Sequence, residues 1–133
     1  MHLFFASQAL DGSATAPLPS PLHDILSAGL PAQTAICLSV VLIAPVVEEF
    51  IYRGFLLPSI ASKTPLPIAL LSSSLIFAVS HANEGAWPEL FSLGFVLGGV
   101  YCCSGHLVAP IGVHMLYNAF VFGSQLFFVV SNE

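Results

Sequence analysis

The sequence predicts an all-α integral membrane domain, a bundle of about four transmembrane helices, and three observations lead to this prediction. Only 7% of the 133 residues are charged, whereas soluble domains carry about 25%. Hydrophobic residues make up 56% of the chain, and the mean hydropathy is +0.92. These residues gather in four runs. A helix needs roughly 20 residues to cross a bilayer, and the longer runs reach that length. Because backbone polar groups in lipid must bond within the protein, we expect helices.

The first two runs follow a polar beginning. Residues 1–29 are rich in Ala, Ser, Pro and Gly and are predicted to be a flexible lead segment. The membrane domain is predicted over residues 30–130. Its first helix begins near Leu30 and continues without a break into the charged sequence EEFIYRGFLLP. The second run, residues 66–81, is short for a span, and we expect it to be tilted or sunk within the protein.

The third and fourth runs differ in composition. The third, residues 90–103, contains Gly94, Gly98 and Gly99. Small residues at this spacing let helix backbones approach closely in lipid, so we expect tight helix packing here. The fourth run, residues 107–130, is long enough to span a bilayer by itself.

The charge balance limits the partners of the chain. Arg53 and Lys63 are its only fixed cations against seven acidic residues, which gives a net charge of −5. Nucleic-acid binding needs a basic surface, so no nucleic-acid partner is expected. Composition instead predicts membrane lipid as a partner and a multi-pass protein of the cell membrane. Tyr52, Trp87 and Tyr101 flank apolar runs and are expected to anchor the membrane interface.

The first helix carries three ionisable residues, although each such group costs at least about 2.5–3.5 kcal/mol near the centre of a membrane. Glu49 precedes Arg53 by four residues, the favourable order for a helical ion pair. Glu48 is turned by about 100° from Glu49 on a helix, so Arg53 cannot face both carboxylates equally well. Glu48 is therefore the carboxylate that remains available for a role other than pairing with Arg53.

Two further groups of unusual residues lie in later apolar runs. The sequence FAVSH places Phe77 and His81 on one helical face, and HMLYN does the same for His114 and Asn118. In a chain with so few charges, a carboxylate, two imidazoles and an amide on three helices indicate one interior polar site.

Such a set of groups suits the hydrolysis of an amide bond. A carboxylate and an imidazole can remove a proton from one water molecule. A second imidazole and an amide can donate hydrogen bonds to the oxyanion of a tetrahedral intermediate. The sequence has no G-x-S-x-G motif, no cysteine with an obvious base and no paired Asp, so serine, cysteine and aspartyl peptidase schemes have little support.

The three groups together resemble a known family. EEFIYRG resembles the EExxxR motif, FAVSH the FxxxH motif and HMLYN the HxxxN motif of the CPBP intramembrane proteases. This family includes the type II CAAX prenyl endopeptidases and the bacteriocin self-immunity and lysostaphin resistance proteins. The resemblance covers about Leu30 to Phe122. Members usually have additional spans before the first motif, whereas only residues 1–29 precede it here, so a truncated N-terminus is one expectation.

The resemblance implies an intramembrane glutamate-type endopeptidase with a catalytic set of four residues. Glu48 and His81 would activate the attacking water, and His114 and Asn118 would stabilise the oxyanion.

The resemblance also implies supporting residues and a substrate class. Glu49 and Arg53 would position the first helix, and Phe77 would pack around the site. The substrate would be a peptide or protein associated with the membrane, and the family name suggests C-terminal processing after a prenylated cysteine. No cofactor and no metal are expected.

Three alternatives remain open at this stage. The first is a non-catalytic scaffold or bacteriocin self-immunity protein with the same fold. The second is an ion or proton carrier, although no inverted repeat is visible. The third is a zinc-dependent membrane peptidase, since carboxylates and imidazoles can ligate zinc. Its ligands would come from Glu48, Glu49, His81 and His114.

Overall fold

The computed structural model describes residues 29–81 and 86–131, so the predicted lead segment lies outside the described residues except for Gly29. The described residues form four helical segments and no strand, which confirms the predicted all-α membrane fold. The first segment is one long helix made of five consecutive parts, and three shorter segments follow it. The parts of the long helix are α3 (Leu30–Leu38), η1 (Ser39–Ile43), α4 (Ala44–Glu49), η2 (Phe50–Leu56) and α5 (Leu57–Ala61), and the other helices are α6 (Leu66–Ser80), α7 (Trp87–Ser104) and α8 (Val108–Ser131).

The long helix contains two π-helical turns, η1 and η2, and each ends two residues before a proline, Pro45 or Pro58. A proline ring inside a helix clashes with the carbonyl four residues earlier and offers no N–H. These carbonyls belong to Val41 and Gly54, which lie within the wide turns. The prolines are therefore accommodated by local widening of the helix at η1 and η2.

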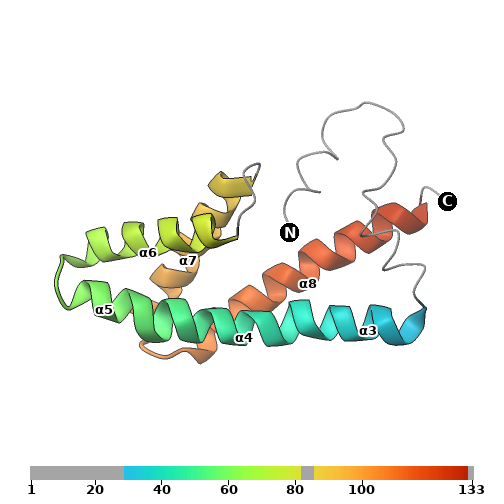
Figure 1. Ribbon diagram of the computed structural model, residues 1–133, viewed down its shortest axis with the longest axis horizontal. Coiled ribbons are helices and arrows are strands. Elements are labelled where there is room, and N and C mark those ends of the chain that lie inside the picture. Colours follow the sequence, from blue (N-terminus) through green and yellow to red (C-terminus); the bar gives the residue numbers. More distant parts are fainter. Residues whose placement is uncertain (1–28, 82–85, 132–133) are drawn as a thin grey trace.

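The four segments form a partly open bundle (Figure 1). After a tight turn at residues 62–65, α6 runs back along the α5 end of the long helix, and α7 packs against α6. Helix α7 ends at Gly105, whose left-handed backbone (φ 72°) suits glycine and closes the helix with an N–H donated to Tyr101 O. Helix α8 then crosses α4 and η1 and diverges from α3.

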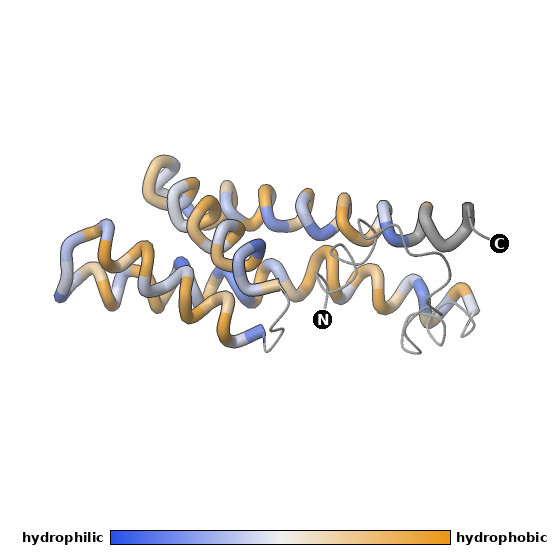
Figure 2. Tube along the Cα trace, turned by 90° about the horizontal axis from the view of Figure 1, so that it is seen from above, coloured by the Kyte–Doolittle hydropathy of each residue, from blue (hydrophilic) through white to orange (hydrophobic). Residues whose placement is uncertain are grey.

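The distribution of polarity is the reverse of that in a soluble protein: large hydrophobic side chains are exposed, and several polar and charged side chains are buried. Phe120 is 74% exposed, whereas Glu49 is 0% exposed. Hydrophobic positions recur along the coloured part of every helix (Figure 2), and many of their large side chains are exposed, among them Phe55, Leu75, Leu116 and Phe120. Within the described residues, Leu30–Ala61 is a helix of 32 residues that is long and apolar enough to cross a membrane, and Leu66–Ser80 is apolar but shorter. This pattern agrees with a helical domain surrounded by lipid.

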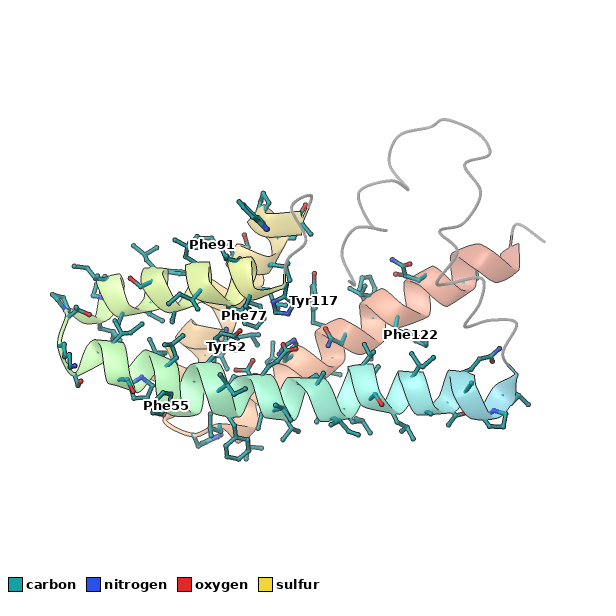
Figure 3. The ribbon with its side chains drawn as sticks, in the orientation of Figure 1. Tyr52, Phe55, Phe77, Phe91, Tyr117 and Phe122 are labelled. Atoms are coloured by element: carbon teal, nitrogen blue, oxygen red, sulfur yellow. The ribbon has the colours of Figure 1, made fainter. Side chains whose placement is uncertain are left out.

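The core between the helices is built on Phe77 and the residues packed against it. Tyr52 from the long helix and Tyr117 from α8 pack against the buried cluster that contains Phe77 (Figure 3). The aromatic side chains therefore join three helices at one place.

The expected close helix packing occurs at two of the three glycines. A Cβ on Gly94 would lie 3.2 Å from Ser74 Cα, and one on Gly98 would lie 2.8 Å from Leu70 Cδ2. Both contacts join α7 to α6. A Cβ on Gly99 would meet nothing within 4 Å, so this glycine does not contribute to the close approach.

Candidate active site

A buried ion pair lies at the centre of the polar cluster. Arg53 Nη1 donates a hydrogen bond to Glu49 Oε1 at 2.6 Å, as the four-residue spacing predicts. Arg53 Nη2 donates to Gly94 O on α7 at 2.7 Å. Because Glu49 and Arg53 are 0% and 2% exposed, the pair has little solvent to replace these contacts. The arginine therefore neutralises the carboxylate and ties the long helix to α7.

His114 on α8 joins the two adjacent glutamates. Its Nδ1 lies 2.9 Å from Glu49 Oε1, and because a carboxylate accepts, Nδ1 is the donor. Its Nε2 lies 3.7 Å from Glu48 Oε2. Glu49 Oε1 thus receives both Arg53 and His114, while no described residue donates to Glu49 Oε2. The contact with Glu49 fixes the ring so that Nε2 faces Glu48.

Glu48 has a more open environment than Glu49. Its Oε2 lies 3.6 Å from His81 Nε2, which is almost the same as its distance from His114 Nε2. Both distances are too long for direct hydrogen bonds but suit bridging by a small polar molecule. The side chains of Glu48 and His81 are 27% and 23% exposed. Glu48 therefore stands between two imidazoles at the edge of the buried cluster.

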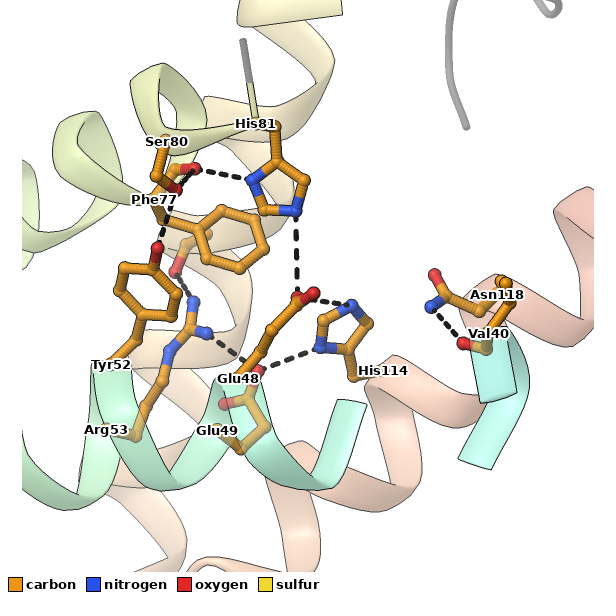
Figure 4. A network of polar contacts seen from close by, with 11 residues as sticks. Val40, Glu48, Glu49, Tyr52, Arg53, Phe77, Ser80, His81, His114 and Asn118 are labelled. Carbon is orange, nitrogen blue, oxygen red and sulfur yellow. Dashed lines mark hydrogen bonds and ion pairs between the residues drawn. The ribbon is translucent and has the colours of Figure 1, made fainter. Parts of the chain in front are cut away.

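A chain of hydrogen bonds holds the imidazole of His81 in place (Figure 4). His81 Nδ1 lies 2.7 Å from Phe77 O, so Nδ1 donates and Nε2 faces Glu48. Ser80 Oγ donates to the same carbonyl at 2.8 Å. Since the Ser80 proton is used there, the hydroxyl of Tyr52 donates to Ser80 Oγ at 2.5 Å. Tyr52 and Glu48, one turn apart on the long helix, thus both contact the end of α6.

The Phe77 ring forms one wall of the cluster. Its centroid lies 4.6 Å from that of His81 and 6.0 Å from that of His114. The Arg53 guanidinium carbon lies 4.9 Å from the same ring centroid, which is within cation–π range. Phe77 is fully buried, so the polar groups surround an apolar side chain rather than a solvated space.

Asn118 lies apart from the carboxylates. Its Nδ2 donates to Val40 O in η1 at 3.0 Å. In Figure 4 the amide stands on the α8 side of His114, away from Glu48 and His81. The structure therefore brings Glu48, His81 and His114 together and places Asn118 one helical turn further along α8.

Sequence reasoning missed three participants in this network. Tyr52 was expected at the membrane interface, but its hydroxyl bonds to Ser80 and its ring lies 5.0 Å from Phe77. The position of Tyr52 four residues after Glu48 was a signal that could have placed it on the same helical face. Ser80 and the Val40 carbonyl carried no comparable signal, because their roles depend on which helices meet.

The cluster can polarise and deprotonate a small molecule beside Glu48. The carboxylate supplies a proton acceptor, and two imidazole Nε2 atoms face it from different helices. The described side chains include no group of three or more His, Cys, Asp or Glu that is placed to hold a metal ion.

Comparison with known proteins identifies the family. The family model for the type II CAAX prenyl endopeptidase Rce1-like proteins matches residues 30–120. The chain is 36% identical over 91 residues to the membrane-embedded CAAX protease MroQ of Staphylococcus aureus (strain USA300), covering 64% of this chain and 37% of that protein. It is 31% identical over 85 residues to the putative membrane peptidase YdiL of Bacillus subtilis (strain 168), covering 64% and 35%.

A mammalian relative matches the same part of the chain. The chain is 33% identical over 76 residues to CAAX prenyl protease 2 of Rattus norvegicus, covering 57% of this chain and 24% of that protein. The matched part thus spans roughly a quarter to somewhat over a third of these relatives. No solved structure matches. Because the family model covers more than half of the chain and includes all three polar motifs, the chain belongs to the type II CAAX prenyl endopeptidase Rce1-like family.

Proposed function

We propose that this chain is a multi-pass membrane endopeptidase in which Glu48 is the general base. One observation carries the proposal: Glu48 is a partly exposed carboxylate that faces two imidazoles beside the buried Glu49–Arg53–His114 cluster. Charged groups on apolar helices are costly, and such a group without a close partner indicates a functional site. Glu49 has partners at hydrogen-bond distance, whereas Glu48 has none at that distance and is accessible.

The reaction begins with a water molecule between Glu48 Oε2 and His81 Nε2. Glu48 takes one proton from this water while the water oxygen forms a bond to the carbonyl carbon of the peptide. The electron pair of the C=O π bond moves to the carbonyl oxygen, which becomes the oxyanion. His81 orients the water through Nε2, because Nδ1 is held by Phe77 O. Collapse of the tetrahedral intermediate breaks the C–N bond, and Glu48 returns the proton to the leaving amine. General base catalysis of this kind contributes about 10²–10⁴-fold to rate.

The negative oxygen of the intermediate needs hydrogen-bond donors. His114 takes this role as an imidazolium, in which Nδ1 donates to Glu49 and Nε2 donates toward the oxyanion. Asn118 supplies amide hydrogens from the next turn of α8. One Asn118 N–H is donated to Val40 O, which leaves the second N–H for the oxyanion. Loss of one such donor typically lowers turnover about 10²–10³-fold.

The proposed substrate is a peptide bond near the C-terminus of a membrane-associated protein that carries a prenylated cysteine. Support comes from the family and from a relative named CAAX prenyl protease 2. The lipid-facing character of the helices suits a substrate held at the membrane of the cell.

The test uses the full chain in detergent or proteoliposomes with quenched peptides that end in a cysteine-containing tetrapeptide, with and without a farnesyl group. We compare wild type with Glu48→Gln and with Glu89→Gln, which removes an exposed carboxylate in the first turn of α7. Turnover is expected to fall at least 10²-fold in Glu48→Gln and to be unchanged in Glu89→Gln.

Two results would contradict the proposal. Cleavage by Glu48→Gln at the wild-type rate would exclude Glu48 as the base. If folded wild-type protein cleaves neither peptide, the chain is a non-catalytic member of the family. Cleavage of both peptides at equal rates would keep the endopeptidase and exclude recognition of the prenyl group.

A further inference from the structure

The wide turn η1 removes the usual α-helical donor to the carbonyl of Val40. In a regular α-helix this carbonyl would accept from Ala44, but the Ala44 N–H donates to Ser39 O instead. In a continued π turn it would accept from residue 45, five positions later. That residue is Pro45, which has no N–H. Neither the α-helical donor nor the π-helical donor is therefore available to Val40 O.

A side chain from another helix fills this position. Asn118 Nδ2 on α8 donates to Val40 O at 3.0 Å, across 78 residues of sequence. An unpaired carbonyl is costly where hydrocarbon surrounds the helix, because no water can replace the missing donor. The amide of Asn118 thus does the work of the missing backbone N–H of residue 45.

The same contact sets where the carboxylates lie. One helical turn earlier on α8, His114 contacts Glu49. Two polar contacts therefore join α8 to the long helix, and Pro45 lies between the two contacted residues, Val40 and Glu49, in sequence. Because the wide turn changes the rotation of the helix, a contact on each side of Pro45 fixes the rotation of α4 relative to α8.

We propose that Asn118 is a positioning residue. It supplies the hydrogen bond that Val40 O lacks in the wide turn before Pro45, and it thereby holds Glu48 and Glu49 against α8. This inference concerns the site of the proposed peptidase, but its main test measures stability and does not rest on that activity. It gives Asn118 a role in the resting protein, in addition to any donor role toward an oxyanion.

The test is a double-mutant cycle on the full chain in detergent, with melting temperature as the readout. Asn118→Ala should lower the melting temperature by several degrees, since it leaves Val40 O unpaired. Pro45→Ala restores an N–H at the position that a π turn bonds to residue 40. In the Pro45→Ala background, the loss caused by Asn118→Ala should therefore shrink to less than half. Asn118→Leu, which keeps a similar size but has no hydrogen-bond donor, should behave like Asn118→Ala.

Two controls make the rescue specific. Pro58→Ala removes the proline after the other wide turn, where no described side chain donates to the corresponding carbonyl of Arg53, so it should not reduce the effect of Asn118→Ala. Gln125→Ala removes another amide of α8, and its effect should be the same with Pro45 or Ala at position 45.

Each outcome decides the question. If Asn118→Ala fails to fold and the double variant Asn118→Ala/Pro45→Ala folds, the rescue supports the proposal. Additive losses in the double variant, or no folded double variant, overturn it. Peptide cleavage by the double variant is measured separately. If its stability recovers and its turnover does not, Asn118 both positions the helix and donates to the oxyanion. If stability and turnover both recover, Asn118 is a positioning residue alone. Failure of the peptidase proposal would leave the stability cycle unaffected.

Discussion

Glu48 and Glu49 are neighbours in sequence but occupy opposite kinds of environment. Glu49 is fully buried, and its Oε1 accepts from Arg53 at 2.6 Å and from His114 at 2.9 Å. Glu48 is partly exposed, and its nearest imidazole nitrogens lie at 3.6 and 3.7 Å. Glu49 thus belongs to a closed network with Arg53 and His114, whereas Glu48, one residue earlier on the same helix, lies at an accessible edge of the cluster.

The difference shows how a membrane domain can hold two charges of the same sign without giving them the same task. The buried carboxylate needs its partners, because removing one leaves an uncompensated charge in a low-dielectric interior. The edge carboxylate can exchange protons because its contacts are longer and solvent can reach it. The closed network orients His114 toward the open one, so the two environments depend on each other.

The largest expected effect comes from breaking the closed network at its cation. Arg53→Met keeps an apolar side chain of similar length but leaves Glu49 with His114 alone. Removing one partner of a buried ion pair costs about 3–5 kcal/mol, so we expect little folded protein. Size-exclusion chromatography in detergent measures the folded yield.

A second variant sharpens this result. Arg53→Met/Glu49→Leu removes both charges, and replacing a buried pair by apolar residues is often neutral in stability. We expect the folded yield to recover but turnover to stay low, because His114 loses the acceptor of its Nδ1. Recovery of both yield and turnover would show that Glu49 does not orient His114.

The next largest effect tests the close packing of α7 on α6 at Gly94, whose carbonyl accepts from Arg53. Gly94→Ala would place a Cβ 3.1 Å from Phe77 Cδ1 and 3.2 Å from Ser74 Cα, and the Ser74 contact is to backbone. Overpacking of this kind costs about 1–3 kcal/mol. Gly99→Ala is the matched control, since nothing lies within 4 Å of its Cβ. A melting temperature lowered only by Gly94→Ala is expected, and equal losses would contradict it.

The smallest expected effect concerns the open site. Tyr52→Phe removes the hydroxyl that donates to Ser80 but keeps the ring against Phe77. We expect a stability loss of about 1 kcal/mol, typical of one hydrogen bond. Turnover should fall several-fold while KM stays unchanged, because His81 would be held less firmly. Ser80→Ala should have a similar effect, and no additional loss in the double variant would place both residues in one chain.

Much of the fold could be predicted because the apolar runs are long and sharply bounded. The predicted second, third and fourth runs correspond to α6, α7 and α8 with boundaries shifted by at most three residues. The pair of Glu49 with Arg53 follows from a spacing within one helix. Such local relations need only the helical period, which the sequence contains.

Relations between helices could not be predicted in the same way. The contact of His114 with Glu49, and that of Asn118 with Val40, depend on how α8 crosses the long helix. The partner of Arg53 on α7 is a backbone carbonyl, Gly94 O, which has no side-chain signature. Such contacts arise from packing, and polar residues on apolar helices indicate only that some partner exists.

Because of the two wide turns, the number of residues per unit length is not constant along the long helix. A π turn holds more residues than an α turn of the same rise, so one residue could be deleted from Ser39–Ile43 with little change in apolar character. The wide turn would then become a regular α turn, and the parts of the helix on either side of it would keep roughly the same rotation relative to each other. A single-residue gap here in an alignment of homologous sequences would thus mark a change in helix geometry rather than in a loop.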